Sequence, residues 1–568
     1  MPRSSWSLIA SLTLAACASP GAPVTEHDTQ STLMGSYLMG RYADLTKNPT
    51  LAAQNYISAL RQEPSDPVLL EGAVGSALVA GDIERAGAAA AMAQARGADS
   101  SLGRLTLATL ALRTGHYADA RVLTQASEGP PFDRLAARVL RAWALAGENK
   151  TDLALAALGD AGQSAPFARL FDYQRAMILE HAGRSAEAIK AFESAMPGGL
   201  RTPSGIVEYG SLLQRQGKKD AAIALYKQVL ADGDEPTIAA ALARAQRGEQ
   251  PPPSVLTKPA GGAAIGMFSL AALLLGQTDA DFYMPYLTLA LALDPTLDGA
   301  RLVYAEGLQE MHLWDGSASA LDHVPVGSPV YERALVQRVF LLRQQDDQAG
   351  AIKLAREAVQ RTNGRLARLA LADLLRDTEK FSEAEPLYTT LIAESSDTTS
   401  QQWRLYFARG ACRERMGRWS EAQADLKKAL QLSPEQPEVL NYLGYSWIDQ
   451  GVNLKEGLKM IERAVALEPE AGYIVDSLGW AYFKLGDYPA AVEHLERAVE
   501  LSPDDAILND HLGDAYWRDG RRAEARFQWQ RSLTLKPSAA DKATLEAKLV
   551  KGLPAALVKR TARAEEKR

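Results

Sequence analysis

A spacing of 34 residues recurs along most of this 568-residue chain and constrains its fold more than any other feature. In the first half a small residue returns at intervals of 34, at Ala52, Ala86, Ala120, Ala154, Ala188 and Ala222. In the second half two further residue types keep intervals of 34 or 35, at Gly410, Gly444, Gly479 and Gly513 and at Pro434, Pro469, Pro503 and Pro537. Because independent residue types share one period, the chain is predicted to be an array of repeats.

Each repeat has the pattern of two antiparallel helices. Gly479 and Ala491 are small where the two helices must approach closely, and Tyr482 and Leu495 are large enough to fill the space between repeats. Pro503 cannot continue the second helix. These features resemble the tetratricopeptide repeat (TPR). The resemblance implies an all-α protein, a TPR α-solenoid of about fourteen helix-turn-helix repeats in two arrays that form a right-handed superhelix.

The phase of the repeats suggests the domain limits. Weaker repeats can be aligned on Tyr283, Ser317, Ala351, Ala384 and Ala422. The interval from Ala222 to Tyr283 is 61, and its surplus includes the prolines at 251–253. We therefore expect an N-terminal TPR array at 34–235, a Pro/Gly-rich linker at 236–262 and a C-terminal TPR array at 263–537. Residues 538–568 are expected to form a capping helix and a basic tail.

The N-terminus has the layout of a secretory signal. A short basic opening is followed by eleven uncharged residues, Trp6 to Ala16, and then by Cys17. The run Leu14-Ala15-Ala16-Cys17 resembles the bacterial lipobox, which implies a lipoprotein signal peptide at 1–16, lipidation of Cys17 and a flexible tether at 17–33. By the same resemblance, Ala18 in place of aspartate implies a cell outer membrane location facing the periplasm. The alternative is an ordinary signal peptide with a chance cysteine.

A second apolar segment, Pro259 to Thr278, raises the question of a membrane span. Its apolar part is only fourteen residues long, Ala263 to Gly276, which is shorter than a bilayer requires. We expect a buried helix there and no transmembrane helix.

The sequence offers little for catalysis. No metalloprotease, CxxC, nucleophile-elbow or phosphate-loop motif occurs, and the seven histidines are scattered over different repeats. Cys412 lies among small residues of a first helix and is expected to be a buried, inert thiol. The formal net charge of −7 argues against a general nucleic-acid binder. We expect no enzyme activity, no cofactor and no metal.

A TPR array instead offers the surface of its first helices to a protein or peptide partner. Carried over from the family, the positions that line this groove in the last three repeats are Asn441, Tyr445, Ile448, Asp449, Tyr473, Asp476, Trp480, Phe483, Lys484, Asp510, Asp514, Trp517 and Arg518. Aromatic anchors with a row of amide and carboxylate groups favour cationic or amide-rich partners. The alternative is that Phe483 and Trp517 merely pack between helices.

Three segments carry a closer resemblance, Leu440–Trp447, Asp476–Trp480 and Asn509–Trp517. They are similar to a family of long bacterial TPR lipoproteins, one type of which is an outer-membrane adaptor that binds a periplasmic carboxyl-terminal processing protease and presents cell-wall hydrolases to it. The resemblance implies a scaffold that brings protease and substrate together. The alternatives are a scaffold for envelope assembly or polysaccharide export, and a peptidoglycan-linked enzyme. The oligomeric state is not indicated.

Overall fold

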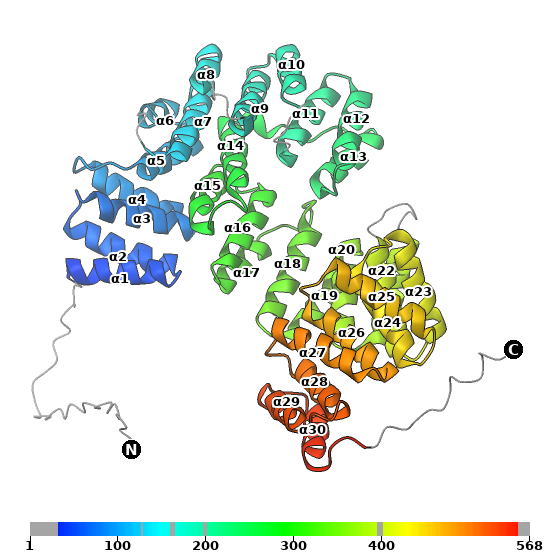
Figure 1. The fold of residues 1–568 in the computed structure, drawn as a ribbon. Helices are drawn as coiled ribbons and strands as arrows, with labels where there is room; N and C mark the ends of the chain where they lie inside the picture. The colour runs from blue at the N-terminus through cyan, green and yellow to red at the C-terminus, as the bar shows by residue number, and fades with distance from the viewer. Residues whose placement is uncertain (1–31, 126–128, 160–164, 197–201, 395–401, 555–568) are drawn as a thin grey trace, which may run out of the picture. The chain divides into compact units, whose positions relative to one another are not determined.

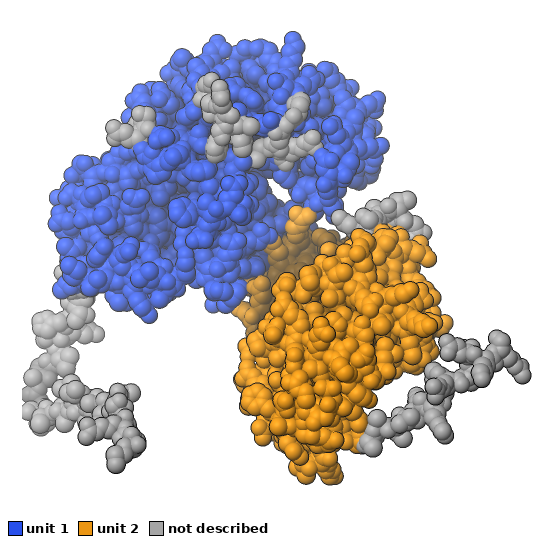
Figure 2. All heavy atoms as spheres, in the orientation of Figure 1, with its two compact units in different colours: residues 1–330 blue, residues 331–568 orange. Residues whose placement is uncertain are grey.

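The computed structural model describes residues 32–125, 129–159, 165–196, 202–394 and 402–554. Within these ranges every regular element is a helix, thirty α-helices and the short 3₁₀ helix η2 (Val255–Thr257). Cys17 and most of the predicted tether and basic tail lie outside the described residues. The helices fall into two compact units, residues 1–330 and 331–568 (Figure 2).

Consecutive helices pack as antiparallel pairs, with eight pairs in the first unit and six in the second (Figure 1). The pairs of the first unit are α1 (Leu33–Leu45) with α2 (Pro49–Gln62), α3 (Pro67–Val79) with α4 (Ile83–Gln94), α5 (Ser101–Arg113) with α6 (Tyr117–Leu123), α7 (Pro131–Gly147) with α8 (Thr151–Leu158), α9 (Ala165–His181) with α10 (Ser185–Ala195), α11 (Pro203–Arg215) with α12 (Lys219–Leu230), α14 (Pro259–Leu274) with α15 (Ala280–Leu293), and α16 (Asp298–Glu310) with α17 (Trp314–Asp322). A single helix, α13 (Pro236–Gln246), stands between α12 and α14.

The second unit continues the pattern and ends on an unpaired helix. Its pairs are α18 (Tyr331–Gln344) with α19 (Gln348–Thr362), α20 (Arg365–Asp377) with α21 (Phe381–Ala393), α22 (Trp403–Arg415) with α23 (Trp419–Leu432), α24 (Pro437–Asp449) with α25 (Leu454–Leu467), α26 (Gly472–Leu485) with α27 (Tyr488–Leu501), and α28 (Ala506–Arg518) with α29 (Arg522–Thr534). The last helix is α30 (Ala539–Lys551). The fourteen pairs are the fourteen repeats predicted from the spacing.

The period has a physical origin at the turn inside each pair. The six alanines that set it in the first half are all fully buried in second helices. In twelve of the fourteen pairs, the residue five positions before the repeated small position has a positive φ, as in Gly81 and Gly486. A left-handed residue at this point ends the first helix and reverses the chain. Glycine fills seven of these twelve positions because it adopts positive φ without steric cost.

Close approach of the paired helices explains the second-half glycines. A Cβ on Gly479 would lie 2.6 Å from the Leu495 side chain, and a Cβ on Gly444 would lie 2.6 Å from the carbonyl oxygen of Gly457. Both distances are well below ordinary contact. The predicted role of Gly479 is therefore confirmed, and Gly457 replaces the usual alanine because its partner helix comes equally close.

The first unit is closed by its seventh repeat in a way that the sequence did not predict. Helices α14 and α15 pack against α3, α5, α7 and α9, which are the first helices of four earlier repeats (Figure 1). Gly262 of α14 fits directly under the Trp143 indole, where no side chain could be accommodated. The Tyr286 hydroxyl donates to Asp133 at 2.6 Å and the Thr288 hydroxyl donates to the Leu78 carbonyl at 2.6 Å. One continuous apolar core results.

This packing differs from the predicted domain limits. Residues 236–262 contain α13, η2 and the start of α14, and the division between compact units falls at 330/331. The segment before α14 is held to the first unit, because the Ser254 hydroxyl donates to Glu208 at 2.6 Å and His181 Nδ1 lies 2.7 Å from the Leu256 carbonyl oxygen. The loss of phase marked an extra helix and a docked segment rather than a linker between two arrays.

The uncharged segment that raised the question of a membrane span forms α14, and this prediction of a buried helix is confirmed. Thirteen of its residues are buried among neighbouring helices. Over the part of the chain that the structure describes, the helices all fall short of the length and apolar character needed to cross a bilayer.

Candidate protein-binding surface

The groove positions predicted from sequence lie on α24, α26 and α28 of the second unit. These are first helices of successive repeats, and α26 packs against both α24 and α28. Because equivalent first-helix positions recur about every 34 residues, their side chains line up across neighbouring helices. The structure thus brings the candidates from three repeats into one series, but it leaves them in different states of exposure.

Trp480 is half-buried at the centre of this series. Its indole stacks on the Phe483 ring at a centroid distance of 4.6 Å and on the His511 imidazole at 4.0 Å. The Lys484 ammonium lies 5.9 Å from the indole centroid. Phe483 also contacts Tyr488, so it packs on both sides. Phe483 thus contacts aromatic rings on two sides and supports the Trp480 indole.

Asp476 and His511 form a buried pair beside Trp480. The imidazole Nδ1 lies 3.0 Å from each carboxylate oxygen of Asp476. Burial lowers the pKa of His511, but the charge and hydrogen bond of Asp476, with smaller contributions from Asp510 and Asp514, outweigh it and raise the pKa overall. Asp476 is thus already partly neutralised by the protein. His511 was missed as a member of this surface, although its place directly after Asp510 could have indicated it.

Asn441 and Tyr445 extend the surface onto α24. Asn441 is buried, and its Oδ1 accepts no hydrogen bond from the described residues. Burial, together with the charges of Asp449 and Asp476, raises the pKa of Tyr445 to about 12, so its hydroxyl stays protonated. A buried carbonyl oxygen without a donor is costly. Tyr445 is half-buried and offers a neutral hydroxyl to a partner, whereas the Asn441 oxygen lies beneath the surface.

The edge of the surface is open to solvent. Tyr473 is 52% exposed on α26, and Ile507 is 55% exposed on α28. The ammonium of Lys484 on α26 donates to Asp449 on α24, in the neighbouring repeat, at 2.9 Å. Ile448 is buried, and Arg518 is half-buried at the end of α28. The exposed aromatic groups are consequently concentrated on α26.

The candidates of the last repeat are covered by the chain itself. Lys548 of α30 donates to both carboxylate oxygens of Asp510, at 2.7 and 2.8 Å, and to Asp514 at 2.9 Å. Trp529 donates to Asp514 at 2.9 Å. Trp517 is buried against Trp529. As a correction to the predicted groove, Asp510, Asp514 and Trp517 are satisfied internally, because α30 occupies the place of a next first helix.

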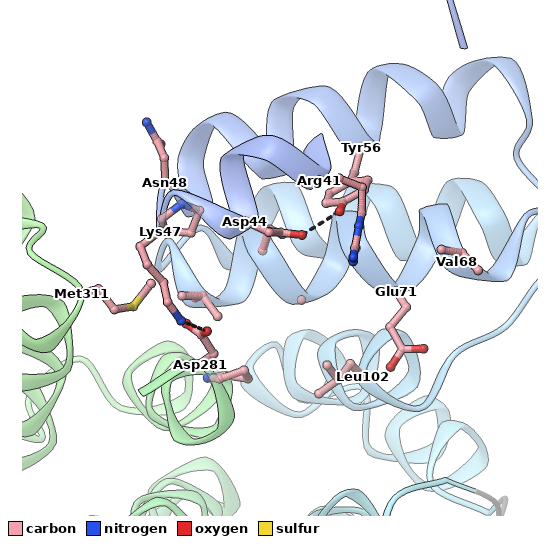
Figure 3. Close-up of a pocket in the computed structure, with 16 residues that line it drawn as sticks. Arg41, Asp44, Lys47, Asn48, Tyr56, Val68, Glu71, Leu102, Asp281 and Met311 are labelled. Atoms are coloured by element: carbon pink, nitrogen blue, oxygen red, sulfur yellow. Dashed lines mark hydrogen bonds and ion pairs between the residues drawn. The ribbon is translucent and has the colours of Figure 1, made fainter. Parts of the chain in front are cut away.

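A second concave feature lies in the first unit, between α1, α3 and α15 (Figure 3). Its volume is about 520 Å³. The Tyr56 hydroxyl and the Ser76 hydroxyl both donate to Asp44, at 2.6 and 3.1 Å. Lys47 pairs with Asp281 at 2.5 Å and ties the seventh repeat to the first. Because its acidic and basic groups are largely paired, this cavity carries no clear preference for a charged ligand.

The remaining reactive groups are sequestered or isolated. Cys412 is fully buried, as predicted, and burial raises the pKa of its thiol to about 11. Within the described ranges no group of three or more histidine, cysteine, aspartate or glutamate side chains is arranged to hold a metal ion.

Comparison with known proteins agrees with the helix pairs. A TPR repeat family model matches residues 479–520, and a tetratricopeptide repeat family model matches residues 403–436. These two segments are therefore similar to TPR repeats. Both matched TPR segments lie in the second unit, and the first includes Trp480 and His511. TPR repeats generally mediate protein–protein interactions, so the array is a protein-binding scaffold in its general character.

Individual relatives cover less of the chain. A TPR repeat-containing protein of Pseudomonas aeruginosa is 26% identical over 104 residues, so the chain spans 18% of that relative's length in the match. A tetratricopeptide repeat protein from Parabacteroides merdae has a TM-score of 0.39 at 14% identity, covering 44% of this chain and 98% of the other. The Cut9–Hcn1 hetero-tetramer structure of APC/C has a TM-score of 0.38 at 18% identity, covering 93% and 100%.

Proposed function

We propose that this TPR protein is a non-enzymatic adaptor, anchored in the outer membrane through acylated Cys17, that binds periplasmic proteins and delivers substrates to a processing protease. The lipobox-like run that ends at Cys17 and the resemblance of residues 437–537 to adaptor lipoproteins support this proposal. A scaffold that holds two proteins raises their effective concentration without adding chemistry.

We call the side chains of Asn441, Tyr445, Tyr473, Asp476 and Trp480 the α24–α26 surface. This surface is the observation that carries the binding role. Tyr473 is 52% exposed and Trp480 is only half-buried, so both leave aromatic area open to a partner. Partially exposed aromatics beside unsatisfied polar groups are typical of binding hot spots. A partner segment with amide or cationic donors and an apolar side chain fits this chemistry.

Co-purification from detergent-solubilised membranes tests the proposal. The tagged wild-type chain is compared with Cys17→Ser, which removes the acyl acceptor, and with Trp480→Ala, which removes the aromatic anchor. We expect the wild type to recover a protease and to stimulate substrate cleavage. Cys17→Ser should leave the membrane fraction, and Trp480→Ala should stay there but recover less partner.

The outcomes separate the alternatives. Recovery of only envelope-assembly or polysaccharide-export components would reject protease delivery while keeping the scaffold. A membrane fraction unchanged by Cys17→Ser, together with no acyl mass on Cys17, would reject the anchor. Equal recovery of partner by wild type and Trp480→Ala would show that the α24–α26 surface is not the binding site.

A further inference from the structure

The first unit contains a cavity whose charge is opposite to that of the α24–α26 surface. It lies between α6, α7 and α8 and has a volume of about 520 Å³. Three of its lining residues are cations, Arg121, Arg141 and Lys150, and the others are apolar, Leu145, Leu153, Ala156 and Ala157. No acidic side chain is among them. On a protein with a formal net charge of −7, a lining whose charged residues are all cations needs a reason.

Among the described residues, one carboxylate pairs with these cations. Glu148 accepts from Arg121 Nε at 3.1 Å and from Lys150 Nζ at 2.9 Å, and these bonds hold the pKa of Glu148 below its usual range. Its side chain is only 14% exposed, so it lies behind the cavity surface. Three positive charges against one negative charge leave an excess that faces the cavity.

Arg141 is the cation that the fold leaves unused. Within the described part of the chain its guanidinium forms no ion pair, and its Nε is buried without an acceptor. A buried donor without a partner costs free energy that a bound acceptor recovers. The planar guanidinium suits a carboxylate, which it can bind through two parallel hydrogen bonds.

From these contacts we infer that this cavity, which we call the α6–α8 cavity, binds an acidic segment of a partner polypeptide. A carboxylate of the segment would bind Arg141, and an adjacent aliphatic side chain would pack against Leu145 and Leu153. Arg121 and Lys150 already donate to one carboxylate, that of Glu148 behind the cavity surface. A volume of several hundred Å³ takes a short peptide stretch rather than a single ion. This inference rests on the proposed function in one respect, because the proposed protein-binding role is the reason for choosing a polypeptide as the ligand.

The two sites would give the adaptor partners of different chemistry. The α24–α26 surface offers acceptors and aromatic rings, whereas the α6–α8 cavity offers cationic donors. A scaffold with opposite preferences at separate places can hold two proteins without their competing for one site.

Fluorescence anisotropy on the detergent-solubilised full chain tests the cavity. The probe is a fluorescein-labelled hexapeptide of alternating leucine and glutamate, and its glutamine counterpart is the negative probe. We expect Arg141→Gln to weaken binding of the acidic probe by about tenfold. Arg134→Gln is the control, because Arg134 lies on the same helix and, among the described residues, its guanidinium donates only to the Gly129 carbonyl outside the cavity. This variant should leave binding unchanged.

A variant that binds more tightly controls for misfolding, because a misfolded chain would lose binding rather than gain it. Glu148→Gln frees the donors of Arg121 and Lys150 and should tighten binding of the acidic probe by about threefold. Equal binding of both probes, or equal effects of Arg141→Gln and Arg134→Gln, would overturn the inference. The inference would also be overturned if the chain bound phosphatidylglycerol vesicles through Arg141 but did not bind the acidic peptide. That result would assign the cavity to a lipid phosphate. If Arg141→Gln fails while Trp480→Ala still loses its partner, the adaptor proposal stands without this cavity.

Discussion

The imidazole of His511 lies on the indole of Trp480, with ring centroids 4.0 Å apart, while its Nδ1 contacts Asp476 at 3.0 Å. One residue of α28 therefore holds both the aromatic and the acidic member of the α24–α26 surface in place on α26. The stack fixes the indole orientation before any partner arrives, which reduces the ordering cost of binding.

Trp480 and Trp517 lie on the first helices of neighbouring repeats and differ in burial, so their truncation separates binding from packing. Trp480→Ala removes a half-buried ring that stacks on Phe483 and His511, and it should lower the free energy of unfolding by about 1 kcal/mol. Trp517→Ala empties a buried site between Trp529 and α30 and should cost about 3–5 kcal/mol. Urea unfolding of both variants measures the difference. Equal losses would place Trp480 in the core.

Two buried glutamates in the first unit predict a pH dependence. Glu180 of α9 and Glu208 of α11 are both buried and share Arg215. Burial, and then the charge of Glu208, raise the pKa of Glu180 to about 7, against the opposing charge of Arg215. Burial also raises the pKa of Glu208, with its hydrogen bond from Ser254 opposing the shift. The protonated form of Glu180 is therefore favoured by folding.

The sign follows from the raised pKa. The stability due to Glu180 is fully present below the unfolded pKa of about 4.3 and is lost as pH rises through about 7. We expect Glu180→Gln, which stays neutral, to keep α9 and α11 protected from hydrogen exchange at pH 8, whereas the wild type loses protection between pH 5 and 8. Glu187→Gln is the control, because Glu187 is exposed and its pKa is lowered by Arg184. Parallel pH profiles for wild type and Glu180→Gln would contradict the prediction.

The intra-repeat turn predicts opposite effects at adjacent residues. Asp346 has φ of 61°, in a position where seven other repeats use glycine. Asp346→Gly should stabilise the second unit by about 1 kcal/mol, because the left-handed conformation is costly for a side chain. Asp347 instead caps α19 by accepting from the Gly350 amide at 2.8 Å, so Asp347→Ala should cost about 1 kcal/mol. Thermal unfolding of the two variants should shift in opposite directions, and a shift of the same sign would refute the role of the turn.

The sequence predicted the local unit well and the long-range packing poorly. Small residues such as Ala188 and Gly479 mark where two helices of one repeat touch, and this contact is set by residues close in the chain. The docking of Tyr286 onto Asp133 joins residues 153 positions apart and leaves no trace in the period. The same limit applies to the surface, because nothing in the spacing shows that Lys548 covers Asp510. The phase of the repeats identifies the first helices, but it does not show which of their side chains are covered by other parts of the chain.

The close backbone approach of α24 and α25 provides the last prediction. A Cβ on Gly444 would lie 2.6 Å from the Gly457 carbonyl oxygen, and both atoms belong to backbone that cannot rotate away. Gly444→Ala should therefore push α24 from α25 and cost about 1–3 kcal/mol, although alanine is the better helix former. Gly410→Ala occupies the same repeat position one repeat earlier, where the nearest atoms lie 3.3 Å away, and should cost less. Urea unfolding followed by tryptophan fluorescence measures the free energy of unfolding of both variants. Because Trp447 is buried beside Gly457, only Gly444→Ala should also change the emission of Trp447 in the folded state. If Gly444→Ala stabilised the protein as an unhindered helical alanine does, the helices would be free to separate, and the close contact would not set the small-residue period.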